Sequence, residues 1–258
     1  MTQFLITLTR SFSKASTKLL DAIFPPVCTI CLKPNGQHDL LCADCFQKLE
    51  IFSGILCQKC GISLKNGDTN TQLCGFCLTN DVLYTASRSF CAYNEASAKL
   101  IAGFKYKDKT HYKRFLAKMM FNACSDLILQ HKVDIICPVP LHYLRMWLRM
   151  FNQSAALAGE IHCRIKDSGT SNVQYIPNLL FRTRYTRPQA SLSRADRIKN
   201  LDGVFEVKEK FSHALAGKTI LLIDDVITTG TTVEKCVKTL QSYGAKNVLI
   251  CTFTKTAG

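Results

Sequence analysis

The pattern of apolar and polar residues changes near residue 82. Beyond that point, short apolar runs alternate with longer segments in which apolar residues recur at helical spacing. The runs at 83–93, 134–137, 220–223 and 247–253 predict strands, and the segments at 97–104, 112–129, 151–163 and 233–240 predict helices. Such alternation indicates an α/β fold in which helices cover both faces of a mostly parallel sheet.

The run at 220–223 is followed by the residues most suggestive of a ligand. Two carboxylates, Asp224 and Asp225, come directly after it, and a hydroxyl-rich turn with Gly230 then leads into the predicted helix. At a strand-to-helix turn the free amides and the helix dipole favour a phosphate, and a glycine lets the backbone approach it closely. The carboxylates would repel a phosphate, so they suit sugar hydroxyls or a hard cation such as Mg²⁺. The turn therefore predicts a phosphosugar site.

The order Asp-Asp-x-x-Thr-Thr-Gly-x-Thr resembles the phosphoribosyl pyrophosphate (PRPP) motif of type I phosphoribosyltransferases. The resemblance implies that both aspartates hold the ribose and that the 5′-phosphate lies on Thr228, Thr229, Gly230, Thr231 and Thr232, with Mg²⁺ accompanying PRPP. Many members have Gly or Ala where this chain has Thr231. Purine-type members have an acid, the general base, where this chain has Thr228, so the catalytic residues stay unknown.

Eight of the 14 cysteines form four Cys-x-x-Cys pairs, which suit two tetrahedral zinc sites. They are Cys28 and Cys31, Cys42 and Cys45, Cys57 and Cys60, and Cys74 and Cys77. Sequential pairing is the simplest arrangement, and a cross-braced one is the alternative. Disulfides would require secretion, but the apolar stretch before Arg10 is too short for a signal peptide. We therefore expect reduced thiols and a cytoplasmic protein.

Three regions are expected along the chain. Residues 1–27 predict a helix that Pro25 and Pro26 end, residues 28–80 a double zinc ribbon, and residues 81–258 the phosphoribosyltransferase-like domain. The first helix packs on the zinc module or lies on a membrane surface, and packing is favoured because its net charge is low. With no apolar window of about 18 residues, the chain is not expected to be an integral membrane protein.

A second loop and a basic segment add positive charge between the cysteine pairs and the PRPP motif. In type I phosphoribosyltransferases a loop at this place in the order of strands receives the pyrophosphate. The resemblance therefore implies a pyrophosphate loop at Val139, Pro140, Leu141, His142 and Arg145, with Arg145 or Arg149 supplying positive charge. Farther on, the segment from 182 to 200 is rich in arginine: Arg182, Arg184, Arg187, Arg194 and Arg197. In a chain of net charge +14, such a stretch attracts several phosphates of one ligand or a nucleic-acid backbone.

The combined motifs are similar to those of the ComF family. Pro-Val-Pro-Leu-His, Phe-Asn-Gln, Arg-x-Thr-x-Pro-Gln and the PRPP motif occur in the family's order, after an N-terminal double zinc ribbon. One departure is Met150, where the family usually has Gly. The resemblance implies a cytosolic, phosphoribosyltransferase-like protein of natural transformation, the uptake of single-stranded DNA at the inner face of the membrane, with possible competence partners there.

Two functions remain open on the sequence. One is a binding protein that takes PRPP or a related phosphosugar with Mg²⁺ and binds single-stranded DNA or a competence protein, with Tyr93, Tyr106, Tyr143, Trp147 and Tyr185 as candidates for stacking on bases. The alternative is an active PRPP-dependent transferase of nucleotide or base salvage, which lacks an identifiable base-recognition signature. A zinc-dependent transcription regulator ranks last because no helix-turn-helix spacing is evident.

Overall fold

The computed structural model describes residues 25–35, 40–64, 72–106, 109–141, 151–169, 172–182 and 204–256. Contacts between residues divide the chain after Lys48 into two compact units, Met1–Lys48 and Leu49–Gly258. The predicted N-terminal helix lies almost wholly outside the described residues. The boundary expected after residue 80, between the zinc ribbon and the phosphoribosyltransferase-like domain, stays a prediction.

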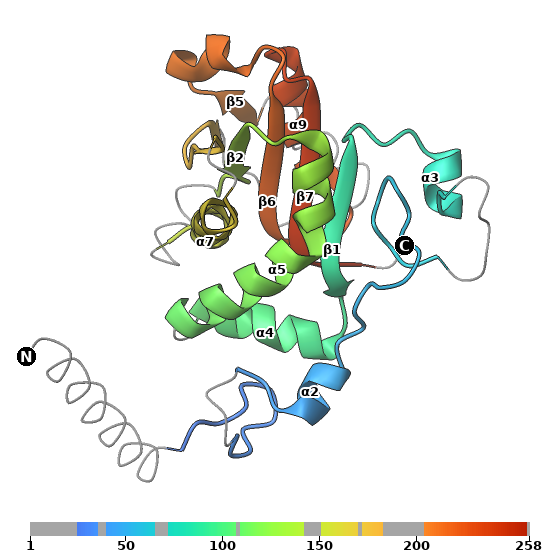
Figure 1. Ribbon diagram of the computed structural model, residues 1–258, viewed down its shortest axis with the longest axis vertical. Helices are drawn as coiled ribbons and strands as arrows, with labels where there is room; N and C mark the ends of the chain where they lie inside the picture. The colour runs from blue at the N-terminus through green and yellow to red at the C-terminus, as the bar shows by residue number, and fades with distance from the viewer. Residues whose placement is uncertain are drawn as a thin grey trace, which may run out of the picture. The chain divides into compact units, whose positions relative to one another are not determined.

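The second unit is built on a five-stranded parallel sheet with the order β1-β7-β6-β2-β3 (Figure 1). Its strands are β1 Ala86–Ala92, β2 Ile135–Pro138, β3 Gln174–Tyr175, β6 Thr219–Ile227 and β7 Asn247–Lys255. Strands β1, β2 and β7 are buried along almost their whole length. This burial explains why β2 and much of β7 read as continuous apolar runs rather than as alternating patterns, whereas β1 contains the buried polar residues Ser87, Arg88 and Ser89.

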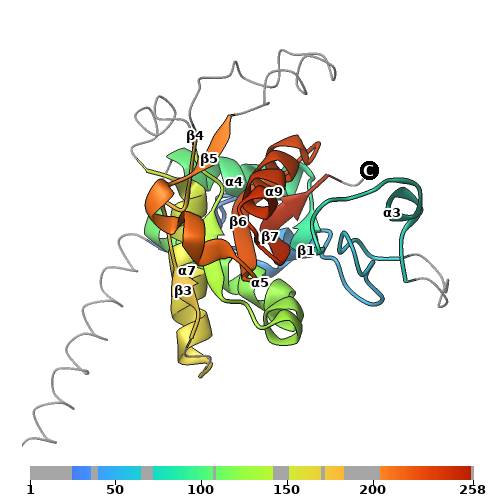
Figure 2. The same ribbon diagram turned by 90° about the horizontal axis from the view of Figure 1, so that it is seen from above.

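Helices cover both faces of the sheet, as the sequence predicts (Figure 2). Helices α5 (Lys109–His131) and α7 (Gln153–Asp167) lie on one face and α9 (Thr231–Ser242) on the other. Neighbouring residues of β7 point to opposite faces of the sheet. Ile250 belongs to the buried cluster that includes the α9 side chains. The thiol of Cys251, the next residue, donates to Met120 O of α5, 3.6 Å away. The remaining long helix, α4 (Glu95–Tyr106), connects β1 to α5.

A small antiparallel pair stands beside the main sheet. Strands β4 (Leu180–Arg182) and β5 (Phe205–Val207) pair so that Arg182 lies opposite Phe205. The 3-10 helix η2 (Glu209–Leu215) follows β5 and leads into β6. These elements, and β3, are two to seven residues long, too short to carry a detectable period, and the sequence did not predict them.

The largest difference from the prediction concerns the two aspartates. The sequence indicated that the strand ends where the carboxylates begin, but β6 continues to Ile227 and pairs Asp224 with Thr252 and Ile227 with Lys255 of β7. The parallel neighbour β7 supplies the hydrogen bonds that hold polar residues in a strand, which an apolar-run criterion cannot detect. The carboxylates therefore sit on a rigid strand rather than on a loop.

Short helices α2 (Ala43–Gln47) and α3 (Gly75–Thr79) begin at cysteine pairs, one in each unit. Among the helices that the structure describes, none is long and apolar enough to cross a bilayer.

Candidate functional site

The first unit holds one group of four cysteines, Cys28, Cys31, Cys42 and Cys45, whose sulfur atoms all lie within 4.8 Å of one another. A tetrahedral zinc with bonds of about 2.3 Å to sulfur requires neighbouring sulfur atoms about 3.8 Å apart. The Sγ atoms of Cys31 and Cys42 are 3.8 Å apart. The group therefore has the composition and the spacing of a structural zinc site.

The second unit holds the other group, Cys57, Cys60, Cys74 and Cys77, also within 4.8 Å of one another. The structure thus pairs the four motifs sequentially, and the cross-braced alternative is wrong for the described residues. Burial is the largest single effect and raises the pKa of Cys57, but hydrogen bonds from the backbone of Cys60, Cys74 and Lys59 and from the Cys60 side chain together lower it to about 7. The backbone nitrogens of Cys60 and Cys74 lie 3.5 and 3.4 Å from its Sγ. N–H donors aimed at a sulfur stabilise a thiolate, the form that binds zinc.

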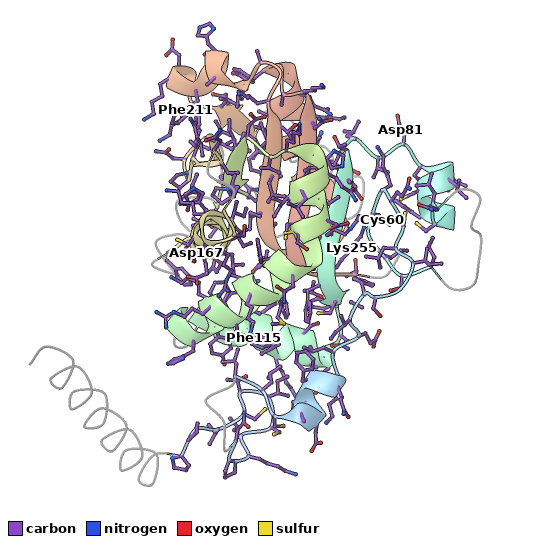
Figure 3. All side chains as sticks on the ribbon, viewed as in Figure 1. Cys60, Asp81, Phe115, Asp167, Phe211 and Lys255 are labelled. Carbon is purple, nitrogen blue, oxygen red and sulfur yellow. The ribbon has the colours of Figure 1, made fainter. Side chains whose placement is uncertain are left out.

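This second group is part of the core beneath α9. Its cysteines belong to the same buried cluster as Val233 and Val237 of α9 and Ile227 of β6. The Lys255 ammonium at the end of β7 donates to Cys60 O, 3.3 Å away, and Figure 3 labels both residues on the two adjoining segments. The cysteine group therefore stabilises the side of the sheet on which the turn from β6 into α9 begins.

The two aspartates of β6 are met by different partners, because neighbouring residues of a strand point in different directions. The Ser154 hydroxyl of α7 donates to Asp224 Oδ1 at 2.8 Å, and the Asp225 N–H donates to the same oxygen at 2.9 Å. Asp225 Oδ2 lies 3.0 Å from the ammonium of Lys105, near the end of α4, with side chains 13% and 21% exposed. The sequence predicted neither Ser154 nor Lys105 as site residues.

The environment of Asp224 disfavours its charge. Burial and the neighbouring Asp225 carboxylate raise the pKa of Asp224 to about 7, although hydrogen bonds from Ser154 and from the Asp225 N–H act in the opposite direction. The Lys105 ammonium pairs with Asp225 and is also close enough to act on the charge of Asp224, so the two adjacent carboxylates share this cation. Such a pair is suited to a ligand that donates hydrogen bonds or brings positive charge.

Gly230 makes the turn from β6 into α9. It is the N-cap of α9 with φ 76°, in the left-handed region, and a Cβ at this position would meet nothing within 4 Å. The space in front of this backbone is therefore open, and the first turn of a 12-residue helix points its N–H groups toward it. The hydroxyls of Thr229 and Thr231 lie 3.0 Å apart at the same place. Together these groups have the arrangement of an anion-binding turn.

The turn is fastened to the end of β7. Thr256 donates through its N–H to Ile227 O at 2.9 Å and through its hydroxyl to Thr228 O at 2.8 Å. The backbone of the turn is consequently held in place before any ligand arrives.

The predicted pyrophosphate loop begins on the adjacent strand. Pro138 of β2 pairs with Ile223 of β6, and Val139 donates to Ile223 O at 2.8 Å. Asn152 caps α7 by accepting from Ala155 N and donates to Val139 O at 3.4 Å. Val139, Pro140 and Leu141 therefore lie beside β6 near the aspartates. His142 and Arg145 lie outside the described residues.

These two strand ends form the point where the sheet's connections diverge. The chain leaves β2 through α7 toward β3, and it leaves β6 through α9 toward β7, on the opposite side. In open parallel sheets, ligands bind beyond the carboxyl ends of the strands at such a switch point. The positions of Asp224, Asp225, Gly230 and Val139 fit this rule.

Of the basic segment, Arg182 alone is described. It ends β4, and its guanidinium lies 5.5 Å from the centroid of the Phe205 ring across the antiparallel pair. Arg184, Arg187, Arg194 and Arg197 lie outside the described residues. Of the aromatic residues proposed for stacking, Tyr93 is 46% exposed.

Two family models match the chain. The double zinc ribbon domain matches residues 19–78, and the phosphoribosyl transferase domain matches residues 184–257.

Curated relatives match over most of their length. Competence protein F of Haemophilus influenzae is 29% identical over 216 residues, 81% of this chain and 88% of that protein. DNA utilization protein YhgH of Escherichia coli K12 is 27% identical over 90% of this chain and 98% of its own, and competence protein ComFC of Streptococcus pneumoniae is 26% identical over 83% and 87%. Together with the two family models, these relatives support a ComF family protein.

Solved structures similar to this chain are phosphoribosyltransferases and related enzymes. A hypoxanthine phosphoribosyltransferase of Staphylococcus aureus matches with a TM-score of 0.36 and 16% identity, covering 55% of this chain and 64% of that one. A phosphoribosylpyrophosphate synthetase of Mycobacterium smegmatis matches with a TM-score of 0.30 and 17% identity, covering 55% of this chain and a smaller share, 33%, of the synthetase.

The sequence signals for the two additional site residues, Ser154 and Lys105, are weak. Ser154 directly follows the Phe-Asn-Gln motif, so its position beside the pyrophosphate loop gave a hint. Lys105 gave none, because a lysine near the end of an amphipathic helix is ordinarily a solvated residue. Only the packing of α4 in the folded protein brings Lys105 to Asp225.

Proposed function

We propose that the protein serves natural transformation in the cytoplasm by binding PRPP, or a related phosphosugar, with Mg²⁺ at the ends of β6 and β2, and by binding single-stranded DNA through the basic segment. The observation that supports phosphosugar binding is the order of chemical groups at the end of β6 and in the turn that follows it. Two carboxylates, Asp224 and Asp225, precede an open helix N-terminus at Gly230. Sugar hydroxyls and a phosphate occur in this relation in a ribose 5-phosphate.

The proposal assigns each end of the ligand to one group. The 5′-phosphate binds the N–H groups at the start of α9 and the hydroxyls of Thr229 and Thr231. The ribose hydroxyls donate to Asp224 and Asp225, which accept through oxygens already oriented by Ser154 and Lys105. The pyrophosphate lies toward Val139, Pro140 and Leu141 and brings the Mg²⁺ that its charge requires.

The part played by DNA is supported by charge and by the relatives. The arginine-rich segment after Arg182 attracts a phosphate backbone. The relatives of this chain are named for competence and for DNA utilization. A protein that binds both a phosphosugar and single-stranded DNA fits a role at the point where DNA enters the cell. Competence proteins are expected as its partners there.

Calorimetric titration of PRPP with Mg²⁺ tests the phosphosugar site. Wild type should bind, and Asp224→Ala/Asp225→Ala should not, while both contain two zinc ions per chain. Equal binding by both proteins would remove the aspartates from the site. The same double variant, introduced into a transformable strain, should lower the frequency of transformants if the site is used in uptake.

A second candidate function is catalysis of phosphoribosyl transfer, which the phosphoribosyl transferase domain favours. The reaction would displace pyrophosphate at the ribose C1. Pyrophosphate release from PRPP, measured with a panel of nucleobase acceptors, decides between the two functions. Binding of PRPP without release in the presence of any acceptor supports a binding protein, and steady release identifies a transferase.

The DNA part has its own test, in which Arg182, Arg184 and Arg187 are replaced together by Glu. Affinity for a fluorescent oligothymidylate should fall, and the dependence of the wild-type affinity on salt should become shallower in the variant. Unchanged affinity and salt dependence would remove the basic segment from the proposal.

A further inference from the structure

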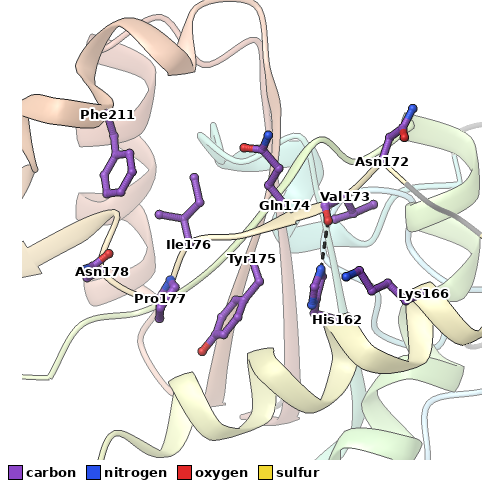
Figure 4. A pocket seen from close by; sticks show the side chains of 10 residues that line it. All are labelled: His162, Lys166, Asn172, Val173, Gln174, Tyr175, Ile176, Pro177, Asn178 and Phe211. Carbon is purple, nitrogen blue, oxygen red and sulfur yellow. Dashed lines mark hydrogen bonds between the residues drawn. The ribbon is translucent and has the colours of Figure 1, made fainter.

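A groove separate from the phosphosugar site runs along β3, the strand at the free edge of the sheet (Figure 4). Its volume is about 860 Å³. Its walls come from the second half of α7, from β3 with the turn that follows it, and from Phe211 of η2. In Figure 4, α7 forms one side, β3 crosses the middle, and Phe211 points in from the opposite side.

The groove combines three kinds of chemistry. Lys166 on α7 supplies positive charge, and none of the described residues that line the groove is acidic. Three amide side chains, those of Asn172, Gln174 and Asn178, offer both donors and acceptors. The ligand that matches is therefore an anion that also has a flat or apolar part and hydrogen-bonding edges.

The floor of the groove is already fixed. The Tyr175 hydroxyl donates to Ala155 O at 2.8 Å, which holds its ring against α7. The ring of His162 packs at 5.8 Å, centroid to centroid, on that of Tyr175, and its Nε2 donates to Val173 O at 3.0 Å. A ligand consequently meets ordered side chains, and little conformational entropy is lost from the floor on binding.

The position of the groove connects it to the basic segment. The turn at Pro177 and Asn178 leads directly into β4, the strand that ends at Arg182 and opens the segment. The return strand, β5, leads into η2 and hence to Phe211. The groove therefore lies at the root of the antiparallel pair from which the arginine-rich segment extends.

We propose that this groove binds one nucleotide of single-stranded DNA. The base lies against the Phe211 ring with its edge toward the amides, and a backbone phosphate contacts Lys166. Aromatic rings and amides beside a basic track are the combination that single-strand binding proteins use. A peptide strand is the less suitable occupant, because β3 pairs through only Gln174 and Tyr175 and offers little backbone for a further strand. The inference deepens the proposed DNA binding and rests on it.

The first test is the affinity of the full chain for a fluorescein-labelled oligothymidylate. Phe211→Leu keeps the apolar packing but removes the ring, and affinity should fall about fivefold or more, the effect of losing one stacked base. Lys166→Met should make the slope of log affinity against log salt shallower by about 0.7, the contribution of one phosphate contact. Matched controls are Tyr243→Leu and Lys118→Met, exposed residues outside the groove, which should bind as wild type.

The second test locates the base. An oligonucleotide in which one thymine is replaced by 5-iodouracil is irradiated on wild type, and the cross-linked residue is identified by mass spectrometry. Cross-linking to Phe211, Tyr175 or His162 is expected. Because Phe211 is partly buried against the core, the zinc content and unfolding midpoint of Phe211→Leu are compared with those of wild type.

The outcomes separate this inference from the proposed function. Wild type that binds the oligonucleotide, with both groove variants binding equally well and cross-links only elsewhere, overturns the groove and leaves the DNA-binding proposal intact. Wild type that does not bind at all overturns both. Loss of affinity in the groove variants together with a cross-link in the groove supports the inference.

Discussion

Replacing Asp224 by Asn should stabilise the protein above neutral pH while weakening its phosphosugar site. Asn has the same shape, and its Oδ1 can accept the hydrogen bonds from Ser154 and from the Asp225 N–H that the carboxylate accepts now. What the substitution removes is a charge that burial and Asp225 make unfavourable. Binding sites commonly contain such residues, which lower stability in return for function.

The magnitude follows from the pKa. A rise from 3.8 to about 7 in the folded state is about three units, which corresponds to roughly 4 kcal/mol. Because the folded pKa is the higher one, the unfolded chain releases the proton first, and the free energy of unfolding falls as pH rises from about 4 to about 7. Above pH 7 the whole effect is present. Between about pH 6 and pH 8.5 this single group should lower the free energy of unfolding by about 1 kcal/mol.

Urea unfolding of wild type and Asp224→Asn at pH 6 and pH 8.5, without PRPP or added Mg²⁺, measures the effect. The difference between the two proteins should grow by about 1 kcal/mol at the higher pH. Taking the difference cancels the titration of groups that do not interact with Asp224, including the zinc ligands. Ser154→Ala, which keeps the charge, serves as a control and should lack the stabilisation. A difference that is the same at both pH values would refute the raised pKa of Asp224.

Three further predictions concern the supports of the site. Lys105→Met should lower the free energy of unfolding, measured in urea, by about 1–3 kcal/mol, because Asp225 loses its partner. Adding Asp225→Asn should recover most of this loss. Additive effects of the two substitutions would contradict the pairing. Cys57→Ser should lose one zinc and lower the melting temperature of the sheet unit, whereas Cys31→Ser should lose one zinc and leave that transition unchanged, as metal analysis and calorimetry can check. Gly230→Ala should cost about 1–2 kcal/mol in urea unfolding, since its φ is 76°, and weaken PRPP binding; an unaltered midpoint would contradict the left-handed turn.

The zinc groups have different structural positions although their sequence motifs are alike. Cys57, Cys60, Cys74 and Cys77 share a buried cluster with α9, and Lys255 joins Cys60 O to the end of β7. The next residue, Thr256, holds the phosphosugar turn at Ile227 and Thr228. Two consecutive residues, Lys255 and Thr256, thus connect the second zinc group to the turn at Ile227 and Thr228, a relation that no spacing of cysteines indicates.

The sequence by itself determined the fold class, the eight zinc-binding cysteines without their pairing, and the candidate site residues Asp224, Asp225 and Gly230. Long apolar runs and helical periodicities identify buried strands and amphipathic helices, because burial imposes those periods. Four Cys-x-x-Cys pairs specify zinc chemistry through local spacing alone. The adjacent residues Asp224 and Asp225 and the turn at Gly230 could be recognised for the same reason, since each is a local pattern.

The tertiary structure decided whatever depends on residues far apart in the chain. It showed that β6 runs through both aspartates, because β7 supplies the hydrogen bonds that keep those polar residues in a strand. It brought Lys105 and Ser154 to the carboxylates, and it assembled the groove beside β3 from segments up to 49 residues apart, from His162 to Phe211. Contacts of this kind are set by how the helices pack on the sheet, and local sequence carries no period that reports them.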